Sequence, residues 1–235
     1  MQDRYAGDIG DYVKFALLRA LGAGERLAVA WYLHPDEGHN GDGRHLTYLD
    51  CPEHWRGLDP DLFDALAATS RRERSVAALV RVGVLPGATF SGEVLASRAL
   101  PAQERCGWRA GWFERTLGGL EGATLAFADP DNGLVDNAPH RRRQPKFGKQ
   151  MPLAEALAMA EGRTAVIYHH NTRMAGGHDR EVALWRERLG PNTLAVRSRA
   201  WSCRTFFIVN PSLAIAERAR EFCARWARHK VRLDC

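Results

Sequence analysis

Short apolar runs alternate with segments of helical spacing along most of the chain. Strands are expected at residues 26–33, 88–95, 123–128 and 164–170. Helices are expected before, between and after them, at residues 11–24, 60–85 (two short helices), 104–120, 151–162 and 179–190, the last with Asp179 as its N-cap. This alternation predicts an α/β fold in which helices cover both faces of a mostly parallel sheet.

The end of the chain follows a different pattern. Residues 193–199 and 205–211 have strand character, and the link between them is too short for a parallel connection, so they are expected to form an antiparallel hairpin. An amphipathic helix follows at residues 212–229, with Ser212 as its N-cap. We predict a single α/β domain over residues 1–235. A mostly parallel sheet that finishes in an antiparallel hairpin is the Rossmann-like outline of class I S-adenosylmethionine-dependent methyltransferases.

Composition and charge limit the partners and the cellular location that can be expected. The formal net charge of +5 is compatible with a polyanionic partner, although many basic globular proteins bind none. The five cysteines are scattered without a Cys-x-x-Cys pair, which favours a reducing, cytoplasmic location over a disulfide framework or a cysteine-rich zinc site. The first residues lack the apolar core of a signal peptide, and no run approaches the ~18 apolar residues of a membrane helix. We expect no membrane partner, and the oligomeric state stays open.

Three expected strands end in polar residues, at 34–43, 129–133 and 168–171. In open α/β sheets, ligands bind beyond the carboxyl ends of the strands. Pro130 disfavours the helical region for Asp129 and so holds it extended at the sheet edge. Asp-Pro-Asp-Asn-Gly is also a good turn sequence, so an ordinary turn is the alternative. Because neighbouring strand residues face opposite sides, at most one of His169 and His170 is expected to face a cleft.

Two loops have compositions that suit a nucleotide or a nucleic acid. In the loop at 34–43, glycines allow close approach of a ligand, and acidic side chains suit ribose hydroxyls, although neither a dinucleotide fingerprint nor a P-loop is present. The basic run at 140–149 has the cations to pair with phosphates and Phe147 to stack on a base. For both segments the alternative is an ordinary solvated loop.

Several segments together resemble one known family. RYAGDIGDYVKFALLRAL near the start, FADPDNG, AVIYHH, and TLAVRSRAWSCRTFFIVNP near the end are similar to segments of the bacterial 23S ribosomal RNA adenine-N6 methyltransferases. That family begins with a Tyr/His-x-Gly-Asn/Asp-x-x-Asp-x-x-Lys pattern and carries an Asp-Pro-Pro-Tyr motif. The resemblance extends from end to end but is patchy. This chain has Asp131 in place of the second proline of the motif and Asn132 in place of its aromatic residue.

The resemblance implies a class I fold with S-adenosylmethionine as cofactor and nucleic acid as partner, RNA rather than DNA. The implied catalytic residues are Asp129, Pro130, Asp131 and Asn132. The resemblance and the composition of the loops together predict a set of cofactor-binding residues. These are Gly7, Asp8, Asp11, Lys14, His34, Asp36, Glu37, Gly38 and Glu93. Substrate-binding residues are expected at Arg141, Arg142, Arg143, Lys146, Phe147 and Lys149. No metal belongs to this prediction.

Two other functions remain open at this point. One is a non-catalytic nucleic-acid-binding module with the same fold. The other is a magnesium-dependent phosphodiesterase or nuclease, because Mg²⁺ prefers carboxylates and water as ligands. Its candidate ligands are Asp36, Glu37, Asp42, Asp129 and Asp131. The leading hypothesis needs Asp129 and the loop at 34–43 to line opposite walls of one pocket.

Overall fold

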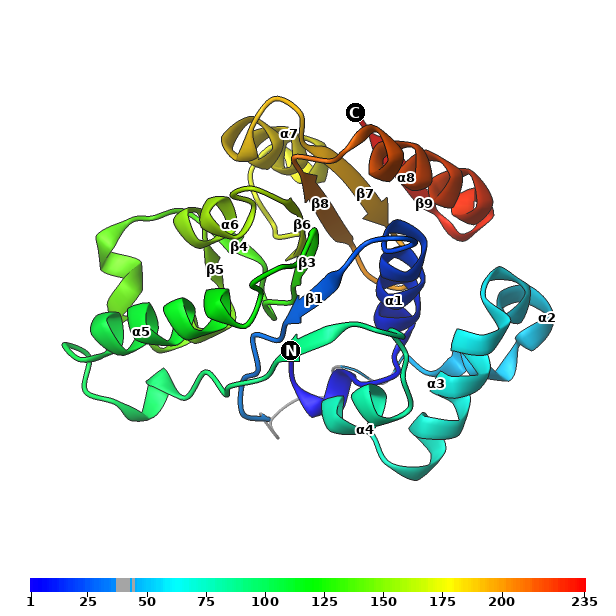
Figure 1. The fold of residues 1–235 in the computed structure, drawn as a ribbon, viewed down its shortest axis with the longest axis horizontal. Coiled ribbons are helices and arrows are strands. Elements are labelled where there is room, and N and C mark those ends of the chain that lie inside the picture. Colours follow the sequence, from blue (N-terminus) through cyan, green and yellow to red (C-terminus); the bar gives the residue numbers. More distant parts are fainter. Residues whose placement is uncertain (37–42, 44) are drawn as a thin grey trace.

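The computed structural model describes residues 1–36, 43 and 45–235, apart from the side chains of Arg98, Arg142, Arg143 and Pro145. Within this part of the chain, one sheet of seven strands has the order β2-β1-β3-β6-β8-β7-β9 (Figure 1). In that order the strands are Thr89–Ser91, Leu27–Ala30, Leu125–Ala128, Thr164–His170, Arg204–Val209, Leu194–Ser198 and Val231–Asp234. A separate two-stranded sheet pairs β4, Leu134–Val135, with β5, Met151–Pro152.

The helices between the strands follow the predicted alternation. They are α1 Ile9–Leu21, α2 Pro52–Trp55, α3 Pro60–Arg72, α4 Val76–Arg81, α5 Arg105–Gly118, α6 Leu153–Met159, α7 Gly177–Leu189 and α8 Leu213–Trp226. Strands β2, β1, β3 and β6 are parallel to one another. The prediction of a mostly parallel core is therefore confirmed.

The predicted hairpin is confirmed as well. Strand β7 pairs with β8 in antiparallel fashion, and β8 also pairs antiparallel with β6, so β8 runs against both of its neighbours. The sequence analysis missed β9, which pairs with the other edge of β7. This strand has only four residues, and Arg232 and Asp234 occupy half of it, so it carries no apolar run.

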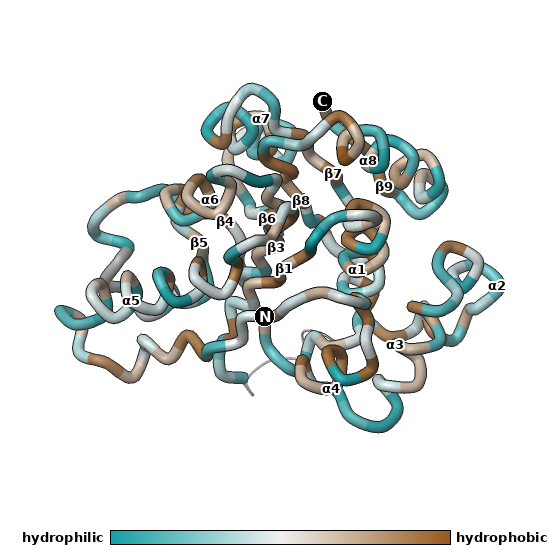
Figure 2. The backbone as a smooth tube through the Cα atoms, viewed as in Figure 1, coloured by the Kyte–Doolittle hydropathy of each residue, from teal (hydrophilic) through white to brown (hydrophobic). Residues whose placement is uncertain are grey.

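Alternate residues of the central strands supply two apolar layers, one on each face of the sheet. On one face Val29, Leu125 and Phe127 pack with α1, α3, α4 and α8. On the other face Ala126 and Ala128 make room for large side chains of α5, α6 and α7. Figure 1 shows these two groups of helices on opposite sides of the strands, and Figure 2 shows hydrophobic colouring along the central strands. No described helix is long and apolar enough to cross a membrane.

The N-caps of two helices show that local sequence determines one helix start and tertiary contacts determine the other. Ser212 accepts a hydrogen bond from the amide of Ile215 and caps α8, as predicted. The sequence analysis also expected Asp179 to cap α7, and this was wrong. The N-cap is Gly176, and the Asp179 carboxylate instead pairs with the guanidinium groups of Arg197 and Arg232. Two cations from the adjacent strands β7 and β9 attract this carboxylate away from the helix end.

A buried network joins β6 to α7. The amide of Leu134 donates to His169 Nδ1 at 3.0 Å, so Nε2 must carry the ring proton and donate to Glu181 Oε1 at 3.1 Å. The backbone amide and hydroxyl of Thr172 and the side-chain amide of Asn171 also donate to Glu181. Burial opposes ionisation of Glu181, but these hydrogen bonds outweigh it and lower its pKa from 4.5 to about 2.

Replacing Glu181 by Gln therefore has a predictable pH dependence. Because the folded-state pKa is depressed, the stabilisation from the carboxylate is complete above pH 4.5 and is lost as pH falls toward 2. Urea unfolding at a series of pH values is expected to show Glu181→Gln less stable than wild type near neutrality, with the gap narrowing below pH 4.5. Glu187→Gln, on the exposed side of the same helix, is the control and is expected to change stability by less than ~0.5 kcal/mol. A gap that stays constant with pH would contradict this account.

Candidate functional site

The carboxyl ends of the parallel strands meet at one polar edge of the sheet. Asp129 follows β3, His170 ends β6, and Arg204 begins the antiparallel strand β8 at the same edge. These side chains line a cavity of about 180 Å³, the strand-end cavity. Its lining residues are Met1, Tyr5, Asp8, Gly10, Asp11, Lys14, Gly43, His45, Asp129, Asp131, Asn132, Tyr168, His170, Ser202 and Arg204.

Lys14 is the cation at the centre of this cavity. It lies on α1, is buried, and donates to Asp129 Oδ2 at 2.8 Å and to Asp11 Oδ1 at 2.6 Å. Burial by itself would lower the pKa of Lys14, but the two carboxylates outweigh it and raise that pKa above its ordinary value. Lys14 therefore stays charged and joins α1 to the end of β3, 115 residues along the chain.

Asp11 connects the same ammonium to the start of α1. Its Oδ2 accepts from the amide of Gly7, and Asp8 caps the helix by accepting from the amide of Asp11. Burial raises the pKa of the Asp11 carboxyl to about 6, with Asp8 and Asp129 acting in the same direction and Lys14 opposing them. The GDIGDYVK segment is therefore both a helix start and one wall of the cavity.

The amino group of Met1 lies in the crevice where the strand order reverses, between β1 and β3. It donates to the carbonyl of Tyr32 at 2.8 Å and to the carbonyl of Asp129 at 3.0 Å, and it pairs with Asp131 Oδ1 at 2.7 Å. Burial opposes ionisation of Asp131, but this ammonium outweighs it and lowers the pKa of the carboxyl. Crevices of this kind are the usual ligand sites of open α/β sheets. Here the crevice holds a primary amine.

Arg204 is a site residue that the sequence analysis missed. Its guanidinium is buried, and Nη2 donates to the hydroxyl of Ser202. Nε and Nη1 are buried and have no hydrogen-bond partner among the described residues. The guanidinium packs so closely on Gly10 that any side chain there would collide with it. A buried cation with two unused donors suits an anionic ligand group such as carboxylate or phosphate.

Five of the nine cofactor residues expected from the sequence line two different cavities. Asp8, Asp11 and Lys14 line the strand-end cavity, whereas His34 and Asp36 line a second one of about 560 Å³. We call it the Trp31 cavity; its walls are Met1, Gln2, Asp3, Trp31, Leu33, His34, Pro35, Asp36, Val76, Ala77, Val80, Arg81, Phe90, Gly92 and Val94. Met1 lines both cavities.

Among the described residues, only the far end of the loop at 34–43 shares a cavity with Asp129, whereas its near end, at His34 and Asp36, lines the Trp31 cavity. Gly43, together with His45 just beyond it, lines the strand-end cavity with Asp129. Glu37, Gly38 and Asp42 lie outside the described residues.

Two predicted positions lie elsewhere. Glu93 is exposed and pairs with Arg115 of α5 at 2.7 Å, and it lines neither cavity. The amide of Gly7 donates to the Asp11 carboxylate and is therefore not available to a ligand. Its neighbourhood is already filled, because any side chain added to Gly7 would collide with Ser70.

Of the predicted catalytic residues, Asp129, Asp131 and Asn132 line the strand-end cavity and Pro130 does not. The carbonyl of Pro130 accepts from the amide of Gly133 at 3.2 Å and closes the turn. Gly133 has a φ of 75° and lies against His169, so both readings of this segment hold: it is a turn, and it lines a cavity. His170 lines the cavity and His169 does not, which confirms that at most one of the pair faces it.

The basic run differs from the predicted base-stacking loop. Phe147 is only 6% exposed and packs against the guanidinium of Arg109, so its ring cannot stack on a base. Arg141 pairs with Asp136 at 2.7 Å. Lys146 is exposed, and Lys149 is half-buried and close enough to lower the pKa of Asp131. The side chains of Arg142 and Arg143 lie outside the described ones.

The candidate magnesium ligands that the structure describes, Asp36, Asp129 and Asp131, do not assemble around one centre. Asp36 and Asp129 line different cavities. Cations already contact Asp129 and Asp131. Among the residues that the structure describes, no three His, Cys, Asp or Glu side chains are grouped to hold a metal ion.

No protein-family model matches this chain, and no curated protein matches it.

Replacing Lys14 by Met tests the centre of the site. At neutral pH the substitution leaves Asp11 and Asp129 buried without their cation, which is expected to cost ~3–5 kcal/mol of unfolding free energy. Because Lys14 helps to hold the pKa of Asp11 down to about 6, its removal lets Asp11 bind a proton at a higher pH, so the loss is expected to shrink as pH falls toward 6 and to be partly recovered by adding Asp129→Asn. Arg81→Met breaks the exposed pair with Glu73 and, as the control, is expected to cost less than ~1 kcal/mol in the same urea titrations. Equal losses for the two substitutions would contradict the account.

Proposed function

We propose that the protein is an S-adenosylmethionine-dependent methyltransferase that acts on an amino group of a nucleic acid, RNA rather than DNA. The observation that carries the proposal is the state of Asp129 at the end of β3. Lys14 holds one carboxylate oxygen, and the other, Oδ1, forms no hydrogen bond with the described residues. Asp129 thus presents an oriented acceptor to the cavity.

The arrangement of the sheet agrees with a class I methyltransferase fold. Four parallel strands are followed by an antiparallel strand, β8, next to the last of them. The end-to-end resemblance to the 23S ribosomal RNA adenine-N6 methyltransferases points the same way. It assigns Lys14 and Asp129 to one site from segments far apart in sequence, and these two residues are in direct contact.

The amino group to be methylated is a weak nucleophile. The lone pair of an exocyclic amine is delocalised into its ring, so an enzyme gains most by holding the amino hydrogens on acceptors and directing the lone pair at the methyl group. Asp129 supplies carboxylate and carbonyl acceptors, and the carbonyl already accepts a hydrogen bond from the Met1 amine at 3.0 Å. A substrate amine would donate to carbonyl and carboxylate oxygens, as the Met1 amine does here.

The Trp31 cavity has the properties that the cofactor needs. Its volume of about 560 Å³ is in the range of small-molecule sites. The rings of Trp31 and Phe90 stack at 6.1 Å, and the buried indole N–H of Trp31 has no partner among the described residues. His34, Asp36, Trp31 and Phe90 would hold the adenosine, with the Asp36 carboxylate suited to ribose hydroxyls. S-adenosylmethionine bound there would supply an electrophilic methyl group.

One observation favours a second candidate, a nucleic-acid-binding module without catalysis. The amine of Met1 occupies the carbonyl of Asp129 and the carboxylate of Asp131, which leaves less of the crevice for a substrate. Under this alternative, S-adenosylhomocysteine does not bind and Asp129 has no role beyond its ion pair.

Calorimetry and methyl transfer together test the proposal. S-adenosylhomocysteine is expected to bind the wild-type protein, and Asp129→Asn is expected to bind it within about 3-fold of wild type, because the Trp31 cavity is unchanged. Transfer of a tritiated methyl group into total bacterial RNA is expected to fall by about 10²–10³-fold in Asp129→Asn, since an oriented acceptor is lost. Glu187→Gln serves as a control with unchanged rates.

Two outcomes would overturn the proposal. One is the absence of binding heat with millimolar S-adenosylhomocysteine in a folded sample. The other is a transfer rate for Asp129→Asn equal to that of wild type while its thermal unfolding remains cooperative.

A further inference from the structure

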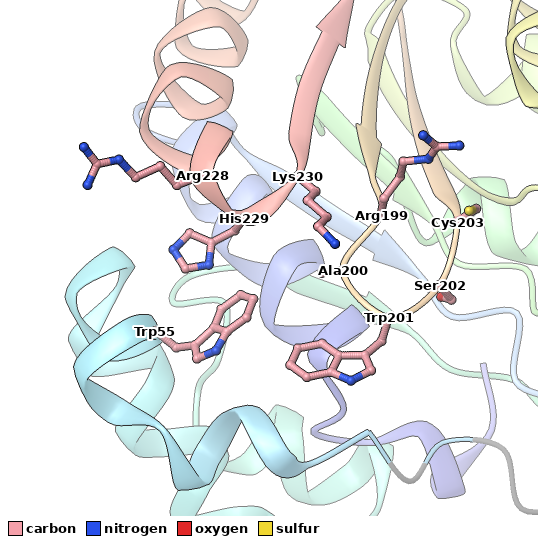
Figure 3. A pocket seen from close by; sticks show the side chains of 9 residues that line it. All are labelled: Trp55, Arg199, Ala200, Trp201, Ser202, Cys203, Arg228, His229 and Lys230. Atoms are coloured by element: carbon pink, nitrogen blue, oxygen red, sulfur yellow. The ribbon is translucent and has the colours of Figure 1, made fainter.

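A third cavity, the Trp201 cavity, opens beside the link between β7 and β8. It has a volume of about 420 Å³ and is lined by residues of that link, by Trp55, the last residue of α2, and by the segment 228–230 after α8. The indole rings of Trp55 and Trp201 lie 5.7 Å apart, and His229 lies 4.3 Å from Trp55. Three aromatic rings therefore form one wall, as Figure 3 shows.

Trp201 is held in an unusual position. Its indole is 50% exposed, which is rare for so large an apolar side chain, and its backbone has a φ of 59°. Lys230, in the same cavity, has a φ of 61°. Backbone hydrogen bonds fix both: the amide of Arg199 donates to the carbonyl of Lys230, and the amide of Ser202 to that of Ala200. Strained residues that the surrounding structure holds in place are concentrated at functional sites.

The cavity also carries positive charge. Arg199, Arg228 and Lys230 line it, and none of them forms an ion pair with a carboxylate of the described residues. Figure 3 shows Lys230 extending toward the link that carries Trp201, whereas Arg199 and Arg228 extend to opposite sides. The aromatic wall is thus flanked by cations that are available to phosphates.

We infer that the Trp201 cavity binds single-stranded nucleic acid, with one base stacked on Trp201 and the adjoining phosphates paired with Arg199, Arg228 and Lys230. Proteins that bind single strands without reading sequence combine the same two elements, exposed aromatic rings and a cationic path. The surface differs from the basic run at 140–149, where Phe147 is buried.

The position of the cavity connects it to the proposed active site. Ser202 lines both the Trp201 cavity and the strand-end cavity, and its hydroxyl accepts from Arg204. A strand stacked on Trp201 would therefore continue toward Asp129, with the unused donors of Arg204 available to its next phosphate. As an account of the substrate surface this inference rests on the proposed function, but binding itself is measured without cofactor or turnover.

Fluorescence anisotropy with a labelled oligoadenylate of about 12 nucleotides, as RNA and as DNA, tests the stacking. Trp201→Ala is expected to weaken binding by at least about 5-fold, and Trp201→Phe to remain within about 2-fold of wild type, because a smaller ring still stacks. Leu213→Ala removes another exposed apolar side chain, 92% exposed, and is expected to leave binding unchanged. Since Trp201 is exposed, thermal unfolding of the variants is expected to match wild type.

The phosphate contacts are tested by the dependence of affinity on salt. Arg199→Gln and Arg228→Gln are each expected to reduce the slope of log affinity against log salt by ~0.7, whereas Arg220→Gln, an exposed arginine paired with Glu217, is not. Wild-type protein that binds neither oligonucleotide would overturn the inference, and would leave the cavity to a protein partner. Equal affinities for Trp201→Ala and Leu213→Ala would also overturn it. Tight binding without methyl transfer would support this inference and count against the proposed function.

Discussion

The buried ammonium of Lys14 is the interaction on which the site depends. A lone cation cannot be buried at acceptable cost, so Lys14 needs carboxylates at contact distance, and it has them in Asp11 of its own helix and Asp129 at the end of β3. This requirement fixes how α1 lies against the sheet edge. It also fixes the orientation of Asp129, because one of its oxygens is committed to Lys14.

Charge in the strand-end cavity follows from that pairing. Asp131 is balanced by the amine of Met1, and Lys14 is shared by two carboxylates, whereas Arg204 has no carboxylate partner among the described residues. The cavity therefore offers acceptors at one place and unused guanidinium donors at another. A ligand that carries both an amino group and an anionic group, as a nucleotide does, complements this distribution better than either group alone.

Much of the fold was predictable because it depends on local pattern. Buried strands are short apolar runs, helices have apolar residues at helical spacing, and Ser212 caps α8 through its own neighbouring amides. The site was predictable only in part. A strand-end aspartate is visible in sequence, but the burial of Phe147 depends on Arg109, and the partners of Asp179 come from β7 and β9. The unsatisfied guanidinium of Arg204 is likewise a property of tertiary packing, although the glycine at position 10 that makes room for it is visible in the sequence.

The three cavities are linked by shared residues rather than by distance in sequence. Met1 lines both the Trp31 cavity and the strand-end cavity, and Ser202 lines both the strand-end cavity and the Trp201 cavity. The strand-end cavity, at about 180 Å³, is much the smallest of the three and lies between the other two in this sequence of contacts. A cofactor in the Trp31 cavity and a nucleic acid strand in the Trp201 cavity would meet at the strand-end cavity, beside Asp129. For a reaction controlled by positioning, a narrow meeting point between two larger binding sites is an advantage, because it excludes water and limits the approach of the amine to one direction.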